Sequence, residues 1–192
     1  MLALSIGFSF ANADDFVVDG HTYTIMGTGE SPYVTLKEIA NGTTGTFVIP
    51  DVVQYDNVTY RVTSVGFHAS YYAKITKLVI GANVYSTANY AFEGCSTLKE
   101  IDFGSNTFFP GSGAFKGCGF ETLTIPANVQ LSSSYSEQFS SCRSLTSLTV
   151  EGTQISKSCF AGCSSLTEIS MPEVTTIGKQ AFINSPKVRL LN

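Results

Sequence analysis

Several residue types are scarce in this chain of 192 residues, and each scarcity excludes a class of protein. The sequence has no tryptophan and only two histidines, and charged residues make up 14% of it. Its 11 basic and 15 acidic residues are scattered along the chain, so no basic stripe exists that could neutralise a run of phosphates. Nucleic acid and anionic membrane surfaces are therefore not expected partners.

The sequence motifs of common enzymes are also missing. No Gly-rich phosphate loop, Gly-x-Ser-x-Gly, His-Glu-x-x-His or Cys-x-x-Cys occurs. His21 and His68 are isolated, and the closest pair of carboxylates, Glu100 and Asp102, is more typical of a solvated strand than of acid–base catalysis. The sequence predicts neither enzymatic activity nor a metal or cofactor.

Long apolar runs are absent as well, since a membrane-spanning helix needs about 20 apolar residues. The N-terminus has nine, Leu2 to Phe10, followed by Ala11-Asn12-Ala13 and two aspartates. An apolar stretch before a small-x-small site is typical of a secretory signal. We interpret residues 1–13 as such a signal, truncated because the basic leading region is missing; an apolar strand of the fold is the alternative. The predicted location is secreted or cell-surface, without a membrane span.

What the chain does contain is a short motif repeated six times. Its anchor phenylalanines lie 25, 23, 24, 21 and 22 residues apart and are Phe67, Phe92, Phe115, Phe139, Phe160 and Phe182. A period of this size is typical of a solenoid, in which each repeat buries its apolar face against its neighbours. The phenylalanines are expected to form a continuous spine inside it.

A second apolar pattern follows each anchor and alternates with polar residues, as in Leu145-Thr146-Ser147-Leu148-Thr149-Val150. Alternation is the period of a β-strand with one buried face. We expect parallel strands in one sheet, a turn of helix or irregular chain opposite, and two outward columns of side chains. These candidate binding residues are Lys77, Val79, Glu100, Asp102, Thr122, Thr124, Ser147, Thr149, Glu168 and Ser170.

Four of the five cysteines occupy the same place in their repeats, three residues after the anchor. They are Cys95, Cys118, Cys142 and Cys163, while Cys159 takes a slot held elsewhere by alanine. In an exported protein, five cysteines would ordinarily suggest two disulfides and a spare thiol. Their common register favours a ladder of free, buried thiols instead, because free cysteine packs as a small apolar residue.

The phrase Ala-Phe-x-Gly-Cys-Ser-x-Leu-x-x-Ile, found at Ala91 to Ile101 and in part at Phe160 to Ile169, resembles the BspA-type (Treponema pallidum-type) leucine-rich repeat of bacterial surface proteins. The likeness runs from about Val58 to the C-terminus. Departures include Phe67 without Gly-Cys, Gln138 in place of alanine, and Ile183-Asn184-Ser185. The resemblance implies a leucine-rich-repeat solenoid and adhesion to host matrix or other cells.

Residues 14–59 do not show the repeat. Asp19-Gly20 between two alternating arms predicts a β-hairpin, and Tyr55-Asp56-Asn57 predicts a turn into Val58 to Val65. Phe47 to Pro50 is similar to a repeat strand. We therefore expect an N-terminal β cap over residues 14–59 and an array of about six repeats over 60–192.

The expected function is non-catalytic binding of an extracellular protein or glycan at the outward sheet face. A carbohydrate-associated accessory protein, a purely structural module with a solvated face, and an enzyme with an unrecognised site are the alternatives. Aromatic residues in the irregular connections form a second candidate surface; they are Tyr71, Tyr72, Tyr85, Phe108, Phe109 and Tyr135.

Overall fold

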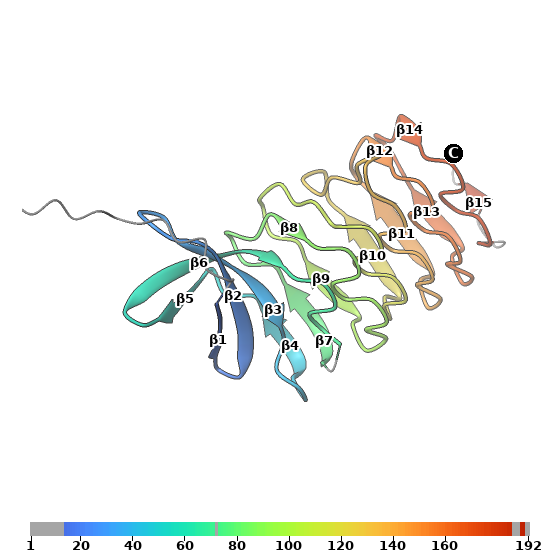
Figure 1. Cartoon of the computed structure of the whole chain (residues 1–192). Coiled ribbons are helices and arrows are strands. Elements are labelled where there is room, and N and C mark those ends of the chain that lie inside the picture. Colours follow the sequence, from blue (N-terminus) through green and yellow to red (C-terminus); the bar gives the residue numbers. More distant parts are fainter. Residues whose placement is uncertain (1–13, 72, 186–188, 191–192) are drawn as a thin grey trace, which may run out of the picture.

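The computed structural model of the chain describes residues 14–71, 73–185 and 189–190 (Figure 1). The predicted secretory signal, residues 1–13, lies outside the described residues, as does Tyr72. No helix long and apolar enough to cross a membrane occurs in the described part of the chain.

The described residues form fifteen β-strands joined by turns. The strands are β1 (Asp15–Val18), β2 (His21–Gly27), β3 (Tyr33–Glu38), β4 (Thr44–Val48), β5 (Val52–Tyr55), β6 (Val58–Val65), β7 (Lys74–Val79), β8 (Ser86–Thr87), β9 (Glu100–Asp102), β10 (Thr122–Ile125), β11 (Ser147–Val150), β12 (Gln154–Ile155), β13 (Glu168–Ser170), β14 (Thr176–Ile177) and β15 (Arg189–Leu190).

Two tight hairpins shape the N-terminal region. Strands β1 and β2 pair across Asp19 and Gly20, whose φ angles are 50° and 81°. Strands β5 and β6 pair across Asp56 and Asn57, at 49° and 60°. Two consecutive positive φ angles define the type I′ turn, whose twist matches that of the strands. Both predicted turns are confirmed.

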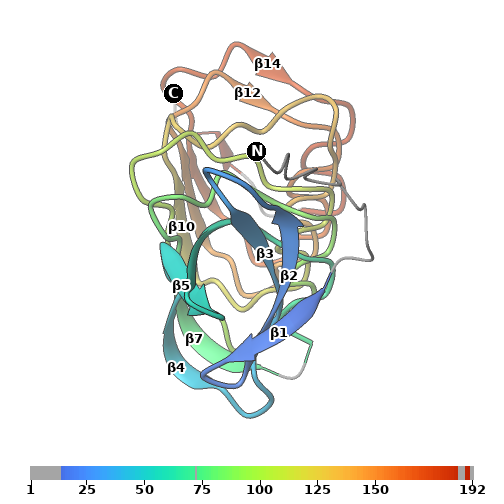
Figure 2. The same ribbon diagram turned by 60° about the vertical axis from the view of Figure 1, so that its left-hand side comes forward.

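The predicted solenoid is confirmed too. Its coils stack through parallel pairs that join β3 to β6 to β8 on one side, and β4 to β7 to β9 on another. Later coils continue with β10, β11, β13 and β15. Figure 1 shows the coils following one another along a single axis, and in Figure 2 the hairpins of β1 to β3 lie over one end of it. The stacking thus begins at β3 and β4.

A column of stacked phenyl rings runs through the interior. Phe92, Phe115, Phe139 and Phe160 are each 0% exposed. Consecutive ring centroids lie 5.3, 5.2 and 5.7 Å apart, and Phe182 continues the column at 5.6 Å. The interplanar angles are 14° or less, so one coil presents a ring face to the next.

Phe67 does not belong to this spine, and its prediction as the first anchor is wrong. Its side chain is 62% exposed, and Ser70 occupies the anchor position instead. The Ser70 N–H donates to the Ala91 carbonyl at 3.2 Å, just as the Phe92 N–H donates to Ala114 in the next coil at 2.8 Å. The backbone register, not the ring, therefore identifies the anchor.

Backbone dihedral angles mark the same register. In the six coils whose anchors run from Ser70 to Phe182, the residue two positions before the anchor has a φ between 50° and 65°; these residues are His68, Tyr90, Gly113, Glu137, Ser158 and Gln180. Counted from Ser70, the first spacing is 22 residues and not 25. Phe67 matched the motif in residue type alone.

Of the two alternatives for the chain opposite the sheet, the turn of helix is wrong and irregular chain is confirmed, because the described residues around the anchors form turns. The N–H groups of Phe92 and Gly94 donate to carbonyls of the next coil at 2.8 and 2.7 Å. Those of Glu93 and Cys95 close turns with carbonyls three residues back, both at 3.2 Å. Alternate N–H groups are thus used between coils, so an α-helix, which needs them all within one segment, does not form.

The five cysteines are free and buried. The Sγ atoms of Cys118, Cys142 and Cys163 donate to the carbonyls of the anchors one coil earlier, at 3.3 to 3.4 Å. Ser185 occupies the same slot in the last described coil and makes the same bond at 3.1 Å. The slot therefore selects a small donor, which accounts for the cysteines without disulfides.

Burial leads to a prediction about thiol reactivity. The thiolate is the reactive form, and burial raises the pKa of Cys159 and of Cys163 to about 12. No thiol of the native, non-reduced protein should therefore react with a disulfide-exchange reagent at pH 8, whereas protein unfolded in guanidinium should show five reactive thiols. Recovery of a single thiol after unfolding would indicate two disulfides and contradict the ladder.

Candidate functional site

The ten side chains predicted to face outward from the sheet do so in the structure, each exposed or half-buried. The strand register aligns them in two columns. In one column Lys77 lies beside Glu100, and Thr122, Ser147 and Glu168 follow in line. The other column joins Val79 to Asp102, and Thr124 to Thr149 and Ser170. We call these ten residues the sheet face.

The sheet face is divided, contrary to the expectation of one continuous sheet. Strands β4, β7 and β9 form one sheet, and β10, β11, β13 and β15 form another. The corner before β10 is one residue shorter than in the preceding repeat, and at Gly119 the backbone passes so close to its neighbour that an added Cβ would lie 2.0 Å from the Ser96 carbonyl oxygen. This altered corner coincides with the interruption between β9 and β10.

Three of the four charged side chains of the sheet face, Lys77, Glu100 and Asp102, lie on β7 and β9, and the fourth, Glu168, lies on β13. The Lys77 Nζ lies 3.3 Å from Glu100 Oε2, and a second ion pair joins Lys99 to Glu121 across the gap between the two sheets. The hydrogen bond from Lys99 lowers the pKa of the Glu121 carboxyl. All four side chains are exposed by 42% or more, so these pairs contribute little to stability.

The part on β10, β11 and β13 carries hydroxyl groups that the fold does not use. Within the described part of the chain, no hydrogen bond is made by the side chains of Thr122, Thr124, Ser147, Thr149 and Ser170. A neighbouring column behaves differently. The hydroxyls of Thr146 and Thr167, each seven residues after its anchor, donate to a backbone carbonyl of the preceding coil, at 2.9 and 3.2 Å. Hydroxyls therefore serve the fold in one column and remain available in the other.

One apolar end of this surface was not predicted from the sequence. Val48 on β4 is 55% exposed and lies beside half-buried Val79 in the parallel register. The similarity of Phe47 to Pro50 to a repeat strand was the available signal, since it places Val48 on the outward side. The outward surface of the strands therefore passes from apolar at Val48 through mostly charged on β7 and β9 to hydroxyl-rich on β10, β11 and β13.

The predicted aromatic surface is only partly present. Tyr71, Tyr85, Phe109 and Tyr135 are between 38% and 67% exposed, but Phe108 is fully buried and contacts Phe103 in the core. The prediction that Phe108 belongs to an exposed aromatic surface is therefore wrong. Adjacent residues of a strand point to opposite faces, so one of the Phe108-Phe109 pair must turn inward.

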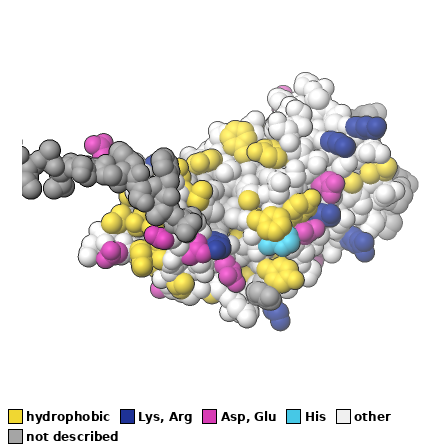
Figure 3. All heavy atoms as spheres, in the orientation of Figure 1, with side chains coloured by type: hydrophobic (Ala, Val, Ile, Leu, Met, Phe, Trp, Pro, Cys, Tyr) yellow, Lys and Arg dark blue, Asp and Glu magenta, His cyan; other side chains and the backbone are white. Residues whose placement is uncertain are grey.

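A further surface, around His68, was not predicted. The His68 ring stacks on Phe67 with centroids 4.0 Å apart and on Tyr71 at 5.9 Å, and Tyr90 meets it edge-on at 6.3 Å. Figure 3 shows this patch as yellow side chains around a cyan imidazole. We call Phe67, His68, Tyr71 and Tyr90 the His68 cluster. The sequence predicted that Phe67 lies inside the spine, so an exposed cluster that contains it was not expected.

Charged groups border the His68 cluster. Glu93 Oε2 lies 3.5 Å from His68 Nε2, and Lys116 Nζ lies 3.7 Å from Glu93 and 3.4 Å from Glu137. Burial lowers the pKa of Lys116, but the carboxylates of Glu137 and Glu93 outweigh it and raise the pKa overall. Lys116 also lies 5.9 Å from the Tyr90 ring centroid, within cation–π range.

The repeated motif can be compared with known repeat families. The sequence profile of the BspA-type leucine-rich repeat region matches residues 63–189 in six copies. The chain belongs to the BspA-type leucine-rich repeat family. Leucine-rich repeat proteins of this kind are typically binding modules without catalytic activity. No curated protein sequence matches this one.

Solved structures agree with the fold. A leucine-rich repeat protein from Bacteroides ovatus is 26% identical, with a TM-score of 0.58 over 92% of this chain and 53% of that one. A leucine rich cell surface protein from Faecalibacterium prausnitzii is 19% identical, with a TM-score of 0.65 over 93% and 54%. The T. pallidum leucine-rich repeat protein is 18% identical, with a TM-score of 0.62 over 92% and 91%. This chain spans about half the length of the first two.

Within the described residues of this leucine-rich repeat protein, no group of three or more His, Cys, Asp or Glu side chains is arranged to hold a metal ion. The carboxylate pair singled out in the sequence is engaged in local contacts. Glu100 pairs with Lys77 at 3.3 Å, and Asp102 accepts a hydrogen bond from the Gly104 N–H at 2.9 Å. The two carboxylates thus have structural partners.

Proposed function

We propose that this protein is a non-catalytic, secreted or cell-surface module that binds other extracellular proteins through its sheet face, in an adhesive role. The observation that carries the proposal is the set of five unused hydroxyls on β10, β11 and β13. Solenoids use their extended sheet surfaces for binding, and leucine-rich repeat proteins of similar fold include a cell surface protein.

The composition of the sheet face suits a protein partner. Hydroxyl groups in parallel columns, about 4.8 Å apart from strand to strand, can donate to or accept from an extended backbone or polar side chains. Each such bond has a modest net value of about 1 kcal/mol, so affinity depends on many of them together. Val48 and Val79 add an apolar contact at one end of this surface.

The test places two bulky cations in the middle of the hydroxyl columns. Thr124 and Thr149 are register partners, so Thr124→Arg with Thr149→Arg covers adjacent strands. Binding of the 192-residue chain to an array of purified extracellular matrix proteins is measured first, and the affinity for any captured protein is then compared. The double variant should bind at least about 10-fold more weakly, which corresponds to about 1.4 kcal/mol.

A matched control adds the same charge elsewhere. Ser105→Arg with Ser164→Arg changes two exposed corner serines outside the sheet face and should leave affinity unchanged. Equal binding by wild type and the Thr124/Thr149 variant would contradict the proposal. In that case Phe67→Ala with Tyr71→Ala tests whether the His68 cluster is the binding surface instead.

A further inference from the structure

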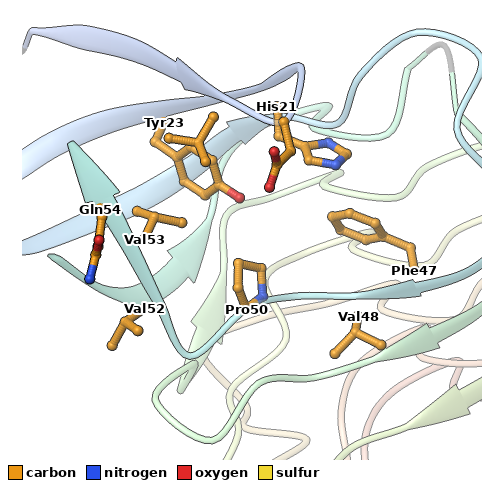
Figure 4. Close-up of a pocket in the computed structure, with 10 residues that line it drawn as sticks. His21, Tyr23, Phe47, Val48, Pro50, Val52, Val53 and Gln54 are labelled. Carbon is orange, nitrogen blue, oxygen red and sulfur yellow. The ribbon is translucent and has the colours of Figure 1, made fainter. Parts of the chain in front are cut away.

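A cavity of about 350 Å³ lies in the N-terminal region, between the β1–β2 hairpin and the segment that joins β4 to β5 (Figure 4). Phe47, Pro50 and neighbouring valines form its apolar walls, and Asp19, His21, Tyr23 and Gln54 contribute polar groups. Its volume is at the lower end of the range for small-molecule sites. Apolar walls with a few convergent polar groups are typical of such sites.

Tyr23 is the most unusual group of this cavity. Its side chain is 1% exposed, and its ring stacks on Phe16 with centroids 5.8 Å apart. Nevertheless its hydroxyl makes no hydrogen bond to any described residue. Figure 4 shows the hydroxyl directed into the space between His21 and Pro50. A hydroxyl that faces a cavity and has no protein partner can both donate to and accept from a bound molecule.

His21 adds a second donor. Its Nδ1 accepts the Ala40 N–H at 3.0 Å, which places the proton of the neutral ring on Nε2. The ring packs on Phe47 with centroids 4.9 Å apart, and burial lowers the pKa of His21, so the neutral form prevails at pH 7. The sequence forms this arrangement locally, because the Asp19-Gly20 turn folds β2 back and places His21 at its first position.

Acceptors lie toward the opening of the cavity. Asp19 and Gln54 are both exposed lining residues, and no lysine or arginine occurs among the described residues that line the cavity. The Asp19 carboxylate therefore repels anionic ligands and can accept hydrogen bonds from hydroxyl groups. One donor on a buried residue, one on a half-buried residue and an exposed acceptor match a ligand that carries several hydroxyls, each of which both donates and accepts.

We propose that this cavity binds one neutral pyranose unit of a glycan. The sugar hydroxyls pair with Tyr23, His21 and Asp19, and the C–H face of the ring packs on Phe47 and Pro50. An aliphatic side chain of a protein ligand would leave the Tyr23 hydroxyl unpaired, and an anionic sugar would meet Asp19. The cavity adjoins the β4 end of that surface through Val48 but includes none of the ten sheet-face residues, so it adds a glycan contact to a protein-binding module.

The experiment uses the 192-residue chain and an array of neutral and anionic glycans, followed by calorimetric titration with the best neutral oligosaccharide. Wild type should bind neutral glycans. Tyr23→Phe keeps the ring and removes only the hydroxyl, and it should weaken binding at least about 10-fold, the loss expected when a buried hydrogen bond to the ligand is removed. Asp19→Asn keeps a residue that tolerates the positive φ, and it should also weaken binding.

Two controls separate this site from others. The Thr124→Arg, Thr149→Arg variant of the sheet face should retain full glycan affinity, and thermal unfolding should show that Tyr23→Phe is folded. Absence of binding to every neutral glycan, selective binding of anionic glycans, or equal affinity of wild type and Tyr23→Phe would each overturn the proposal. None of these outcomes affects the sheet-face result, which is measured with protein ligands.

Discussion

Replacing Phe139 with alanine is expected to lower the free energy of unfolding by about 3–5 kcal/mol, as for other fully buried phenylalanines. The ring is 0% exposed and lies between those of Phe115 and Phe160, at 5.2 and 5.7 Å. Phe103 and Phe120 also contact it, at 6.5 and 6.3 Å. Truncation would remove contacts on both faces and at the edge.

The cavity left by Phe139→Ala cannot close easily. The Phe139 N–H donates to the Cys159 carbonyl at 3.0 Å, and the Phe115 N–H donates to Gln138 at 2.8 Å, so the spacing of the coils is held on both sides. Because each coil contacts only its neighbours, the defect interrupts the stack at its centre. Urea unfolding followed by far-UV circular dichroism measures the loss.

Phe67→Ala is the matched control. This ring is 62% exposed, and surface substitutions of this kind usually change stability by less than about 0.5 kcal/mol. A large loss for Phe67→Ala, or a negligible loss for Phe139→Ala, would show that the spine assignment is wrong.

Alkaline pH is expected to produce the second large effect. An unfolded thiol ionises near pH 9, whereas burial raises the pKa of Cys159 and of Cys163 to about 12 and that of Cys118 and Cys142 also upward. Because the pKa of these thiols is higher in the folded state than in the unfolded state, their contribution to stability is fully present below pH 9 and is lost as the pH rises toward 12. Each such thiol contributes a slope of up to about 1.4 kcal/mol per pH unit.

The free energy of unfolding should therefore fall by several kcal/mol between about pH 9 and pH 11, as measured by urea unfolding under reducing conditions at a series of pH values. Tyr23, whose pKa burial raises to about 12, acts in the same direction above pH 10. The triple variant Cys118→Ser, Cys142→Ser, Cys163→Ser isolates the contribution of these three thiols and keeps that of Cys159. Ser185 already makes the same bond to an anchor carbonyl, so serine fits this slot.

In the triple variant the loss of stability above about pH 9 should be much shallower, because a serine hydroxyl does not ionise in this range. An unchanged slope would assign the alkaline sensitivity to tyrosines or lysines and contradict the part given to the thiols.

Local patterns in the sequence were sufficient to predict the strands and their outward columns. A strand has a period of two, so alternation alone assigns the residues of β11 to opposite faces: Leu148 turns inward, and Ser147 and Thr149 turn outward. The hairpins at Asp19-Gly20 and Asp56-Asn57 were predicted for a similar reason, because few residues tolerate two consecutive positive φ angles.

Other features depended on contacts between coils. Ser70 is the anchor that precedes Phe92 because its N–H pairs with Ala91, and a sequence motif built on phenylalanine cannot show that pairing. The chain around each anchor is a turn, not a helix, because alternate N–H groups bond across to the next coil. The division of the sheet between β9 and β10 likewise arises where one coil meets the next.

The sequence by itself determined the period, the family, the strand faces and the common slot of the cysteines, since each depends on residues that are close in the chain. Only the tertiary structure decided that Phe67 lies outside with His68, that Phe108 is buried, and that the Tyr23 hydroxyl opens into a cavity beside Phe47 and Pro50. These features bring together segments whose mutual placement depends on packing and backbone hydrogen bonding between coils. No local sequence pattern predicts that placement.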